Sequence, residues 1–163
     1  MVEIRFLKSG ELPIWVKLRL EALADAPEAF GDTVDQAKLR SDEEWRESLL
    51  DRDGSLLVAF DGQLPVGMAR VARSEETESS AGLYSMWVAP SARRNGVGRA
   101  LMDAAVVWAE LQRVDEMVLF VAQGNGAKRL YLRTGFVETG RLRPLRSNRE
   151  VQMEEMVRRI SRK

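Results

Sequence analysis

The sequence predicts a mixed α/β fold, in which a sheet is covered by helices on both faces. Two patterns in the 163 residues lead to this expectation. Apolar runs typical of strands alternate with stripes of helical period, and a glycine-bearing loop at residues 93–98 joins the end of one run to the start of a helix. The chain shows no internal repeat or low-complexity segment. We therefore expect a single domain over residues 1–163.

The N-terminal part predicts one strand followed by two helices. Residues 2–7 alternate apolar and charged side chains, as in a strand with one buried face. Apolar positions recur at helical spacing over residues 12–26, and a proline ends that helix. Ser41 followed by Glu44 is a capping-box pattern. It starts a second helix, which we expect to end near Gly54.

The middle of the chain predicts three strands. Residues 56–60 and 66–71 flank an Asp-Gly pair and therefore predict a hairpin. Because residues 63–65 also lie between the two runs, the expected loop is longer than two residues. A third strand is predicted over residues 83–88.

The C-terminal part predicts two further helices and three further strands. The clearest helix follows the glycine loop over residues 97–111, and the continuous apolar run at 117–121 is typical of a strand buried on both faces. A short helix is expected over residues 127–134, before a glycine. Strands near residues 136–140 and 151–157 close the chain.

Composition excludes several functional classes. Lysine plus arginine number 25 and aspartate plus glutamate number 25, so a formal net charge of +0 gives no electrostatic footprint for nucleic acid. No apolar stretch approaches the roughly 20 residues that span a bilayer. The N-terminus starts with Val2-Glu3-Ile4-Arg5, which is unlike a secretion signal. We expect a cytoplasmic protein with neither nucleic-acid nor membrane partners.

Cysteine and histidine are both absent from the sequence. Without cysteine the chain forms no disulfide, no thiolate zinc site and no cysteine nucleophile. Without histidine it lacks Ser-His-Asp chemistry and the usual metal ligand and acid–base residue. We therefore expect no metal site.

The loop Arg93-Arg94-Asn95-Gly96-Val97-Gly98 predicts a pyrophosphate site. Its two glycines remove the Cβ atoms that would hold an anion away from the backbone, and the following helix presents free N–H groups and the positive end of its dipole. The spacing differs from the nucleoside-triphosphate loop G-x-x-x-x-G-K-S/T and from the dinucleotide loop G-x-G-x-x-G.

The remaining pattern, R-x-x-G-x-G, resembles the coenzyme A loop of the GCN5-related N-acetyltransferase (GNAT) superfamily, Q/R-x-x-G-x-G/A. The resemblance extends to residues 86–90 before the loop and to residues 125–131 with Gly135-Phe136 after it. It implies a central, mixed, mostly antiparallel sheet of seven strands with a splay between the fourth and fifth strands. It also implies acetyl-CoA as co-substrate, bound by Met86, Trp87, Val88, Arg93, Arg94, Asn95, Gly96, Val97, Gly98, Arg99, Ala100, Asn125, Ala127, Lys128 and Tyr131.

The same resemblance implies how the site would work. An extended pantetheine arm would pair with peptide groups of Trp87 and Val88 exposed in the splay, and the Val88 N–H would stabilise the oxyanion. Asn125 would bind the coenzyme arm, and Tyr131 would act as general acid toward the departing thiolate. Both also have structural alternatives, because asparagine before a helix is often a cap and a helical tyrosine is often core.

The sequence leaves the general base open. Many relatives carry a glutamate on the strand that contains Tyr84 and Ser85, but this chain has no carboxylate there. Tyr84 or Ser85 could orient a water that relays the proton, or Glu28 and Asp32 could reach in from the loop after the first helix.

The acidic loop at residues 74–80 is either a solvated turn or a rim that attracts a cationic amine.

These inferences predict an acetyl-CoA-dependent N-acetyltransferase acting on a primary amine, either a small molecule or a peptide N-terminus. The absence of cysteine excludes a thioacyl-enzyme, so we expect direct attack in a ternary complex. The alternatives are a catalytically silent acyl-CoA-binding or regulatory module and a transferase that uses another acyl-CoA. Pairing through the C-terminal strand would allow a homodimer. The acceptor itself is not predicted.

Overall fold

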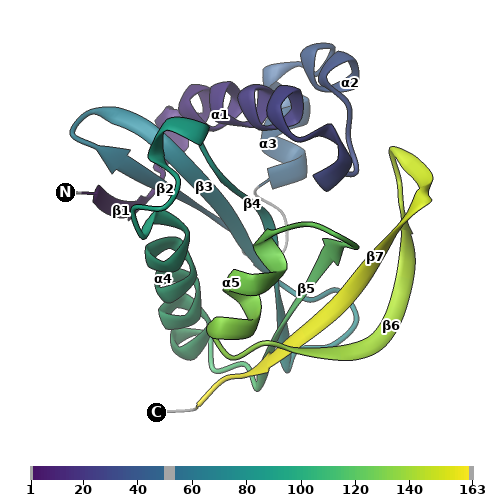
Figure 1. The fold of residues 1–163 in the computed structure, drawn as a ribbon. Helices are drawn as coiled ribbons and strands as arrows, with labels where there is room; N and C mark the ends of the chain where they lie inside the picture. Colours follow the sequence, from purple (N-terminus) through teal and green to yellow (C-terminus); the bar gives the residue numbers. More distant parts are fainter. Residues whose placement is uncertain (1, 50–53, 162–163) are drawn as a thin grey trace.

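The computed structural model describes residues 2–49 and 54–161 and contains a seven-stranded sheet (Figure 1). The strand order is β1-β2-β3-β4-β5-β7-β6, and all neighbours are antiparallel except β4 and β5. This confirms the predicted mixed, mostly antiparallel sheet. The strands are β1 (Val2–Phe6), β2 (Ser55–Asp61), β3 (Leu64–Arg73), β4 (Ser80–Val88), β5 (Glu116–Ala122), β6 (Val137–Leu145) and β7 (Asn148–Arg159).

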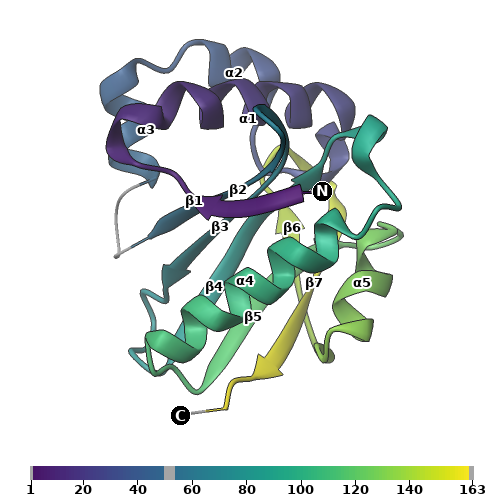
Figure 2. The ribbon, with the colours of Figure 1, turned by 90° about the vertical axis from the view of Figure 1, so that its left-hand side faces the viewer.

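Helices cover both faces of the sheet, as predicted (Figure 2). The first three helices pack on one face, and the last two pack on the other. The helices are α1 (Leu12–Asp25), α2 (Val34–Lys38), α3 (Asp42–Leu49), α4 (Val97–Leu111) and α5 (Ala127–Arg133), with short 3-10 turns η1 (Ser9–Glu11), η2 (Pro27–Ala29) and η3 (Pro90–Ala92).

Apolar side chains on the inner strands alternate between two cores. Leu57 and Ala59 of β2 belong to the core beneath α4, whereas Val58 and Phe60 belong to the core that contains Trp15 of α1. Because both faces of β2 are covered, its side chains are apolar at successive positions. A sheet buried in this way is a rigid support for the strand ends on which the site is built.

The hairpin between β2 and β3 is tighter than predicted. Asp61 pairs with Leu64, so the turn consists of Gly62 and one further residue, and the expectation of a longer loop was wrong. Gly62 has a φ of 64°, which suits a two-residue turn. Pro65 lies within β3 opposite Phe60, beside a register shift where a missing N–H is tolerated.

Other boundaries also differ from the sequence-based expectation. The short helix α2 was not predicted, and the final two strands extend well beyond residues 136–140 and 151–157. β6 is exposed over most of its length, so it carries no apolar periodicity that a pattern could detect. The expected end of the second helix near Gly54 adjoins residues 50–53, which lie outside the described residues.

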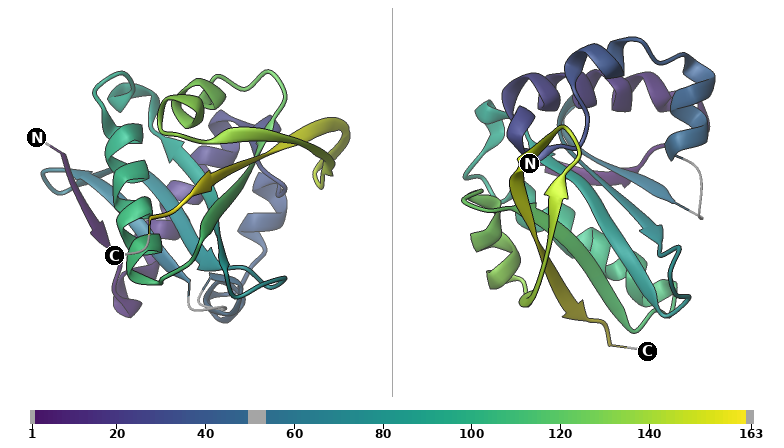
Figure 3. Two further views of the ribbon diagram at one scale, coloured as in Figure 1. Left: turned by 90° about the horizontal axis from the view of Figure 1, so that it is seen from below. Right: turned by 90° about the vertical axis from the view of Figure 1, so that its right-hand side faces the viewer.

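The hairpin formed by β6 and β7 curves away from the sheet and reaches the segment after α1 (Figure 3). Ser147 at its tip donates a hydrogen bond of 2.6 Å from Oγ to the carbonyl oxygen of Phe30. Gly31 lies against the same tip, since a Cβ built there would be 3.3 Å from Nε of Arg146. The hairpin therefore closes one side of the space above the sheet.

Candidate active site

β4 and β5 pair only where both strands begin. The parallel register runs from Ser80 opposite Glu116 to Gly82 opposite Val118, although both strands continue further. Past this point a cleft of about 1490 Å³ is lined by both strands, by the α1 to α3 side and by the β6–β7 hairpin. The splay expected between the fourth and fifth strands is therefore present. It leaves peptide groups of β4 open to an extended ligand.

A β-bulge re-aims β4 beside the cleft. Tyr84 pairs with Arg70 and Trp87 with Met68, so two residues of β4 face one of β3. Ser85 in the bulge has a φ of 56°. The bulge reverses which face alternate side chains occupy, and as a result Trp87 packs beside α1.

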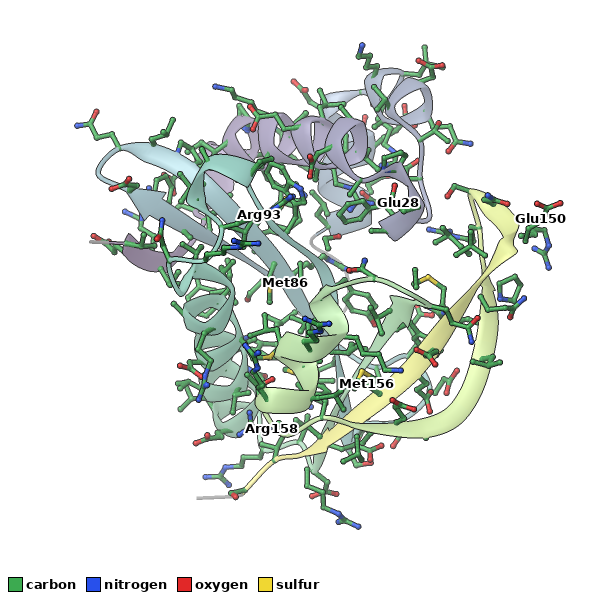
Figure 4. All side chains as sticks on the ribbon, viewed as in Figure 1. Glu28, Met86, Arg93, Glu150, Met156 and Arg158 are labelled. Carbon is green, nitrogen blue, oxygen red and sulfur yellow. The ribbon has the colours of Figure 1, made fainter. Side chains whose placement is uncertain are left out.

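The bulged strand directs one peptide group into the cleft. The N–H of Ala89 donates a 2.8 Å hydrogen bond to the carbonyl oxygen of Val66, on the β3 side. Because successive N–H groups of a strand point to opposite edges, the N–H of Val88 points toward the cleft. Figure 4 labels Met86 on the same strand, between α1 and α5.

The loop before α4 has the geometry of an anion site. Arg94 and Gly96 both have positive φ angles, 66° and 77°, and Gly96 caps the helix. The first backbone hydrogen bond of the helix is donated by the N–H of Ala100 to the carbonyl oxygen of Gly96, at 3.0 Å. The preceding N–H groups, from Val97 to Arg99, are thus without helical partners and stand at the positive end of a 15-residue helix.

Gly98 brings this helix start close to the rest of the cleft. A Cβ built at Gly98 would lie 3.0 Å from Cδ2 of Leu130 on α5 and 3.9 Å from Cγ2 of Val88. A Cβ here would press on the Leu130 side chain, so the absence of a side chain at Gly98 eases the close approach of α4, α5 and the end of β4. The predicted phosphate loop therefore adjoins the splay.

Gly96→Ala and Gly62→Ala form a matched pair that tests this loop. Both glycines have positive φ and open space around the built Cβ, so each substitution should cost about 1–2 kcal/mol of stability. Only Gly96→Ala should also weaken acetyl-CoA binding, by about tenfold, because its methyl group points into the anion site. Calorimetric titration and thermal unfolding would measure the two effects. Equal acetyl-CoA affinity in both variants would contradict the site.

Tyr131 lies at the wall of the cleft and is 6% exposed. Its ring meets Phe136 edge-on, with the ring centroids 6.1 Å apart. Burial raises the pKa of Tyr131 above its usual value, so the phenol stays protonated through the neutral range. Among the described residues its hydroxyl has no hydrogen-bond partner. The tyrosine is thus a core residue that also lines the cleft, and its role as general acid stays a prediction.

Asn125 lies just before the N-cap of α5, Gly126, and also lines the cleft. Its Oδ1 accepts a 2.9 Å hydrogen bond from the N–H of Ala127, the first residue of the helix. This contact between residues two apart is an Asx turn that leads into the helix, rather than the side-chain cap that the sequence offered as an alternative. Among the described residues no group accepts a hydrogen bond from the amide nitrogen of Asn125, which can therefore donate to a ligand.

Arg93 is held by protein groups at the end of α1. Its Nη2 pairs with Oδ2 of Asp25, and its Nε donates a 3.0 Å hydrogen bond to the carbonyl oxygen of Val88. Trp87 donates from Nε1 to the same Asp25 oxygen at 3.0 Å. These contacts fasten α1 to the end of β4. The sequence analysis did not single out Asp25, because its partners lie more than 60 residues away.

Asp25→Asn should destabilise the fold in a pH-dependent way. The hydrogen bonds from Trp87 and Arg93 lower the pKa of Asp25, so its contribution is present above the unfolded-state pKa and is lost as the pH falls below it. We expect a loss of about 0.5–1 kcal/mol at pH 7 that disappears toward pH 3. Urea unfolding at both pH values would measure it. Asp103→Asn, in an exposed pair with Arg99, is the control and should cost less.

Two other cations expected near the cofactor are engaged by carboxylates. Lys128 Nζ lies 2.8 Å from both Glu138 and Glu154, and these hydrogen bonds raise its pKa. Arg99 pairs with Asp103 one turn along α4, at 3.2 Å. Their roles toward the cofactor stay predictions. Arg94, in contrast, is exposed and has no ion pair within the described part of the chain.

The candidate residues for the base lie on the other side of the cleft. Glu28 is exposed on η2, where Figure 4 labels it, and Asp32 is buried beside Arg40 at 2.7 Å. Tyr84 folds over Gly82, where a built Cβ would be 2.2 Å from its hydroxyl. Ser85 accepts a hydrogen bond through Oγ. The structure thus brings all four to one cleft without singling out a base.

The partner of Ser85 is a residue that sequence reasoning missed. Arg19 of α1 donates a 3.0 Å hydrogen bond from Nη1 to Oγ of Ser85. The signal was present in the helical pattern, because Arg19 follows Trp15 by four residues and stands beside the buried Leu18. A charged residue on the buried face of a helix indicates a partner or a ligand.

Two classes of site have no counterpart among the described residues. They contain no group of three or more aspartates or glutamates arranged to hold a metal ion. In the same residues no helix combines the length and apolar character needed to cross a membrane.

A model of the acetyltransferase (GNAT) family matches residues 15–136. The chain belongs to this family. The matched region includes α1, the splayed strands, the phosphate loop and Tyr131. The elements predicted to bind the donor thus lie inside the matched region of this GNAT protein.

Comparisons with individual proteins agree with this family assignment. The mycothiol acetyltransferase of Acidothermus cellulolyticus is 31% identical over 153 residues, covering 85% of this chain and 46% of the relative. The chain thus spans about half the length of the curated relatives it matches.

Solved structures share the fold of this GNAT protein. A GNAT acetyltransferase of Streptococcus pneumoniae superposes with a TM-score of 0.81 at 19% identity, covering 99% of this chain and 100% of that one. An acetyltransferase of Salmonella typhimurium, solved with its cofactor acetyl-CoA, gives 0.74 at 19% identity, covering 100% and 96%. These likenesses confirm the predicted GNAT fold.

Proposed function

We propose that this GNAT enzyme transfers an acetyl group from acetyl-CoA to a primary amine by direct attack in a ternary complex. The observation that carries the proposal is the single continuous cleft. One end adjoins the phosphate loop through Gly98, and the other is walled by Phe30 and Arg146. Both substrates can therefore reach the end of β4 together, and the chain has no cysteine to carry the acetyl group.

The donor would lie along the splay. Its pyrophosphate would accept hydrogen bonds from the N–H groups at the start of α4, and its pantetheine arm would extend beside the open edge of β4. This places the thioester near the N–H of Val88, which would polarise the carbonyl and stabilise the oxyanion as the amine adds. Asn125 would contact the arm through its amide nitrogen.

Tyr131 would then donate its proton to the departing thiolate. The tetrahedral intermediate collapses as the C–S bond breaks, and the sulfur takes up the phenolic proton while the amide product forms. The raised pKa of Tyr131 keeps this proton in place through the neutral range. Glu28, Asp32 or a water held by Tyr84 and Ser85 would remove the proton of the amine, and these roles stay predictions.

Release of free thiol from acetyl-CoA over an amine panel tests the function. The panel should hold small amines, amino acids, polyamines, aminoglycosides and peptide N-termini, together with the acceptor of mycothiol acetyltransferases because relatives bear that name. We expect thiol release that depends on one class of amine. Binding of acetyl-CoA in calorimetry without thiol release for any amine would instead favour a silent acyl-CoA-binding module.

We propose that residues 1–163 form one domain, because β1 and β7 join the same sheet. The cytoplasmic location and a homodimer stay predictions.

A further inference from the structure

Arg19 is a half-buried cation that lines the cleft on the proposed acceptor side. Its guanidinium donates one hydrogen bond to Ser85 and stacks on Phe30, with Cζ 4.7 Å from the ring centroid. No carboxylate of the described residues lies within ion-pair distance of it. Burial lowers the pKa of Arg19 to about 10. A half-buried guanidinium whose one side-chain hydrogen bond goes to a neutral hydroxyl keeps other N–H donors for a ligand in the cleft.

Three carboxylates that line this part of the cleft are paired with other arginines, whereas Glu28, which also lines it, is exposed to solvent. Asp32 pairs with Arg40 at 2.7 Å, and Glu155 pairs with Arg141 at 3.4 Å. Asp25 is held by Arg93. The Asp32 charge also acts on Arg19, but Arg19 shares it with Arg40 and has no ion pair of its own among the described residues.

Two further arginines of the β6–β7 hairpin line the same cleft. Arg143 stacks on Phe120 of β5, with Cζ 3.6 Å from the ring centroid, and burial lowers its pKa. Arg146 meets Gly31 beside the ring that Arg19 covers. The acidic residues Glu75 and Glu76 are exposed and precede β4, at the opposite end of the strand from Val88. Positive charge therefore predominates near the reaction point.

We propose that the acceptor amine carries an anionic group, a carboxylate or a phosphate, which the Arg19 guanidinium binds beside Ser85. This inference rests on the proposed function, because it names the acceptor class of that reaction. The planar guanidinium, held against Phe30, offers its remaining N–H donors to two oxygens of one anion. Arg143 and Arg146 strengthen the attraction from the hairpin.

The position of Arg19 also limits the size of this acceptor. Ser85 and Val88 are three residues apart, which corresponds to roughly 10 Å along a strand. The anion at Arg19 and the amine attacking beside Val88 therefore fit within one small molecule. An α-amino acid or an aminoalkyl phosphate is shorter than this span, so its anion would bind on the side of the guanidinium that faces Val88.

Matched pairs of amines test the proposal. Each proteinogenic amino acid is compared with its amide, and phosphoethanolamine with ethanolamine, by thiol release from acetyl-CoA. We expect the anionic member of the productive pair to be preferred. Arg19→Gln should raise its KM by about 10- to 100-fold and leave the neutral member almost unchanged. A preference within the amino acid pairs would indicate a carboxylate, and a preference for phosphoethanolamine over ethanolamine would indicate a phosphate.

Lys17→Gln is the matched control, because it removes one positive charge from the exposed side of the same helix. It should change neither member of the pair. Arg19→Lys keeps the cation without the planar fork and should retain part of the preference, even where Arg19→Gln folds poorly. Equal use of anionic and neutral members, or an equal loss of both in Arg19→Gln, would overturn the proposal while leaving the transferase function intact.

A binding measurement tests whether Arg19 binds an anion, independently of catalytic turnover. In protein saturated with CoA, which occupies the phosphate loop, inorganic phosphate or acetate should raise the unfolding temperature above that in chloride of equal ionic strength. The increase should persist in Lys17→Gln and vanish in Arg19→Gln. An increase that survives in Arg19→Gln, or no increase in the wild type, would count against the anion site. No thiol release with any amine would instead contradict the proposed function.

Discussion

Val88→Pro is expected to lower kcat of acetyl transfer by about 10²- to 10³-fold, the effect of losing one oxyanion donor. Proline has no backbone N–H, and the N–H of Val88 is the one directed into the splay rather than toward β3. The substitution therefore removes the proposed donor without breaking a hydrogen bond of the sheet. Steady-state kinetics with a productive amine would measure kcat.

Val88→Ala is the control for this change. It keeps the N–H and shortens only a half-buried side chain that packs near Gly98, so it should cost modest stability and little activity. Circular dichroism and thermal unfolding would establish that both variants retain the sheet. Comparable kcat values in a folded Val88→Pro protein and in Val88→Ala would exclude the backbone role.

Tyr131→Phe should also lower kcat, by about 10²-fold or more, with little change in acetyl-CoA affinity. Only the hydroxyl is removed, and this hydroxyl has no partner among the described residues, so folding should be preserved. Because burial raises its pKa, the wild-type acid should remain protonated up to at least pH 9. Activity should therefore show no alkaline loss from this group below that pH.

Tyr84→Phe provides a comparison for Tyr131→Phe, since these are the two tyrosines of the chain. Both hydroxyls belong to residues that line the cleft, but only that of Tyr131 is proposed to meet the sulfur. Stopped-flow or steady-state thiol release across pH 6–9 would compare them. Unchanged turnover of Tyr131→Phe at every pH would remove the tyrosine from the mechanism.

The donor side was predictable because its recognition elements are local. Gly96 and Gly98 act through the backbone of one loop and one helix start, and both lie within the residues whose spacing pointed to coenzyme A. Asn125 lies just before one short helix, and Tyr131 lies within it. Arg93 shows the limit of such reasoning, because its position in the motif suggested a ligand whereas its side chain is tied to Asp25 and Val88.

The acceptor side could not be predicted in the same way. Its walls come from α1, from η2 and from a hairpin whose exposed strand β6 carries no detectable periodicity. The bulge that gives Ser85 its positive φ left no signal in an apolar strand pattern. Nor did any local feature place Phe30 beside Ser147.

The sequence by itself thus determined the family resemblance, the sheet of alternating elements and the donor, since phosphate binding at a helix start depends on contiguous residues. Only the tertiary structure decided the charge of the proposed acceptor pocket. Arg19 meets Ser85 across 66 residues of sequence, and whether its charge is neutralised depends on side chains contributed by several distant elements. The compensation of the Arg19 charge depends on how these elements pack, so the sequence alone does not predict it.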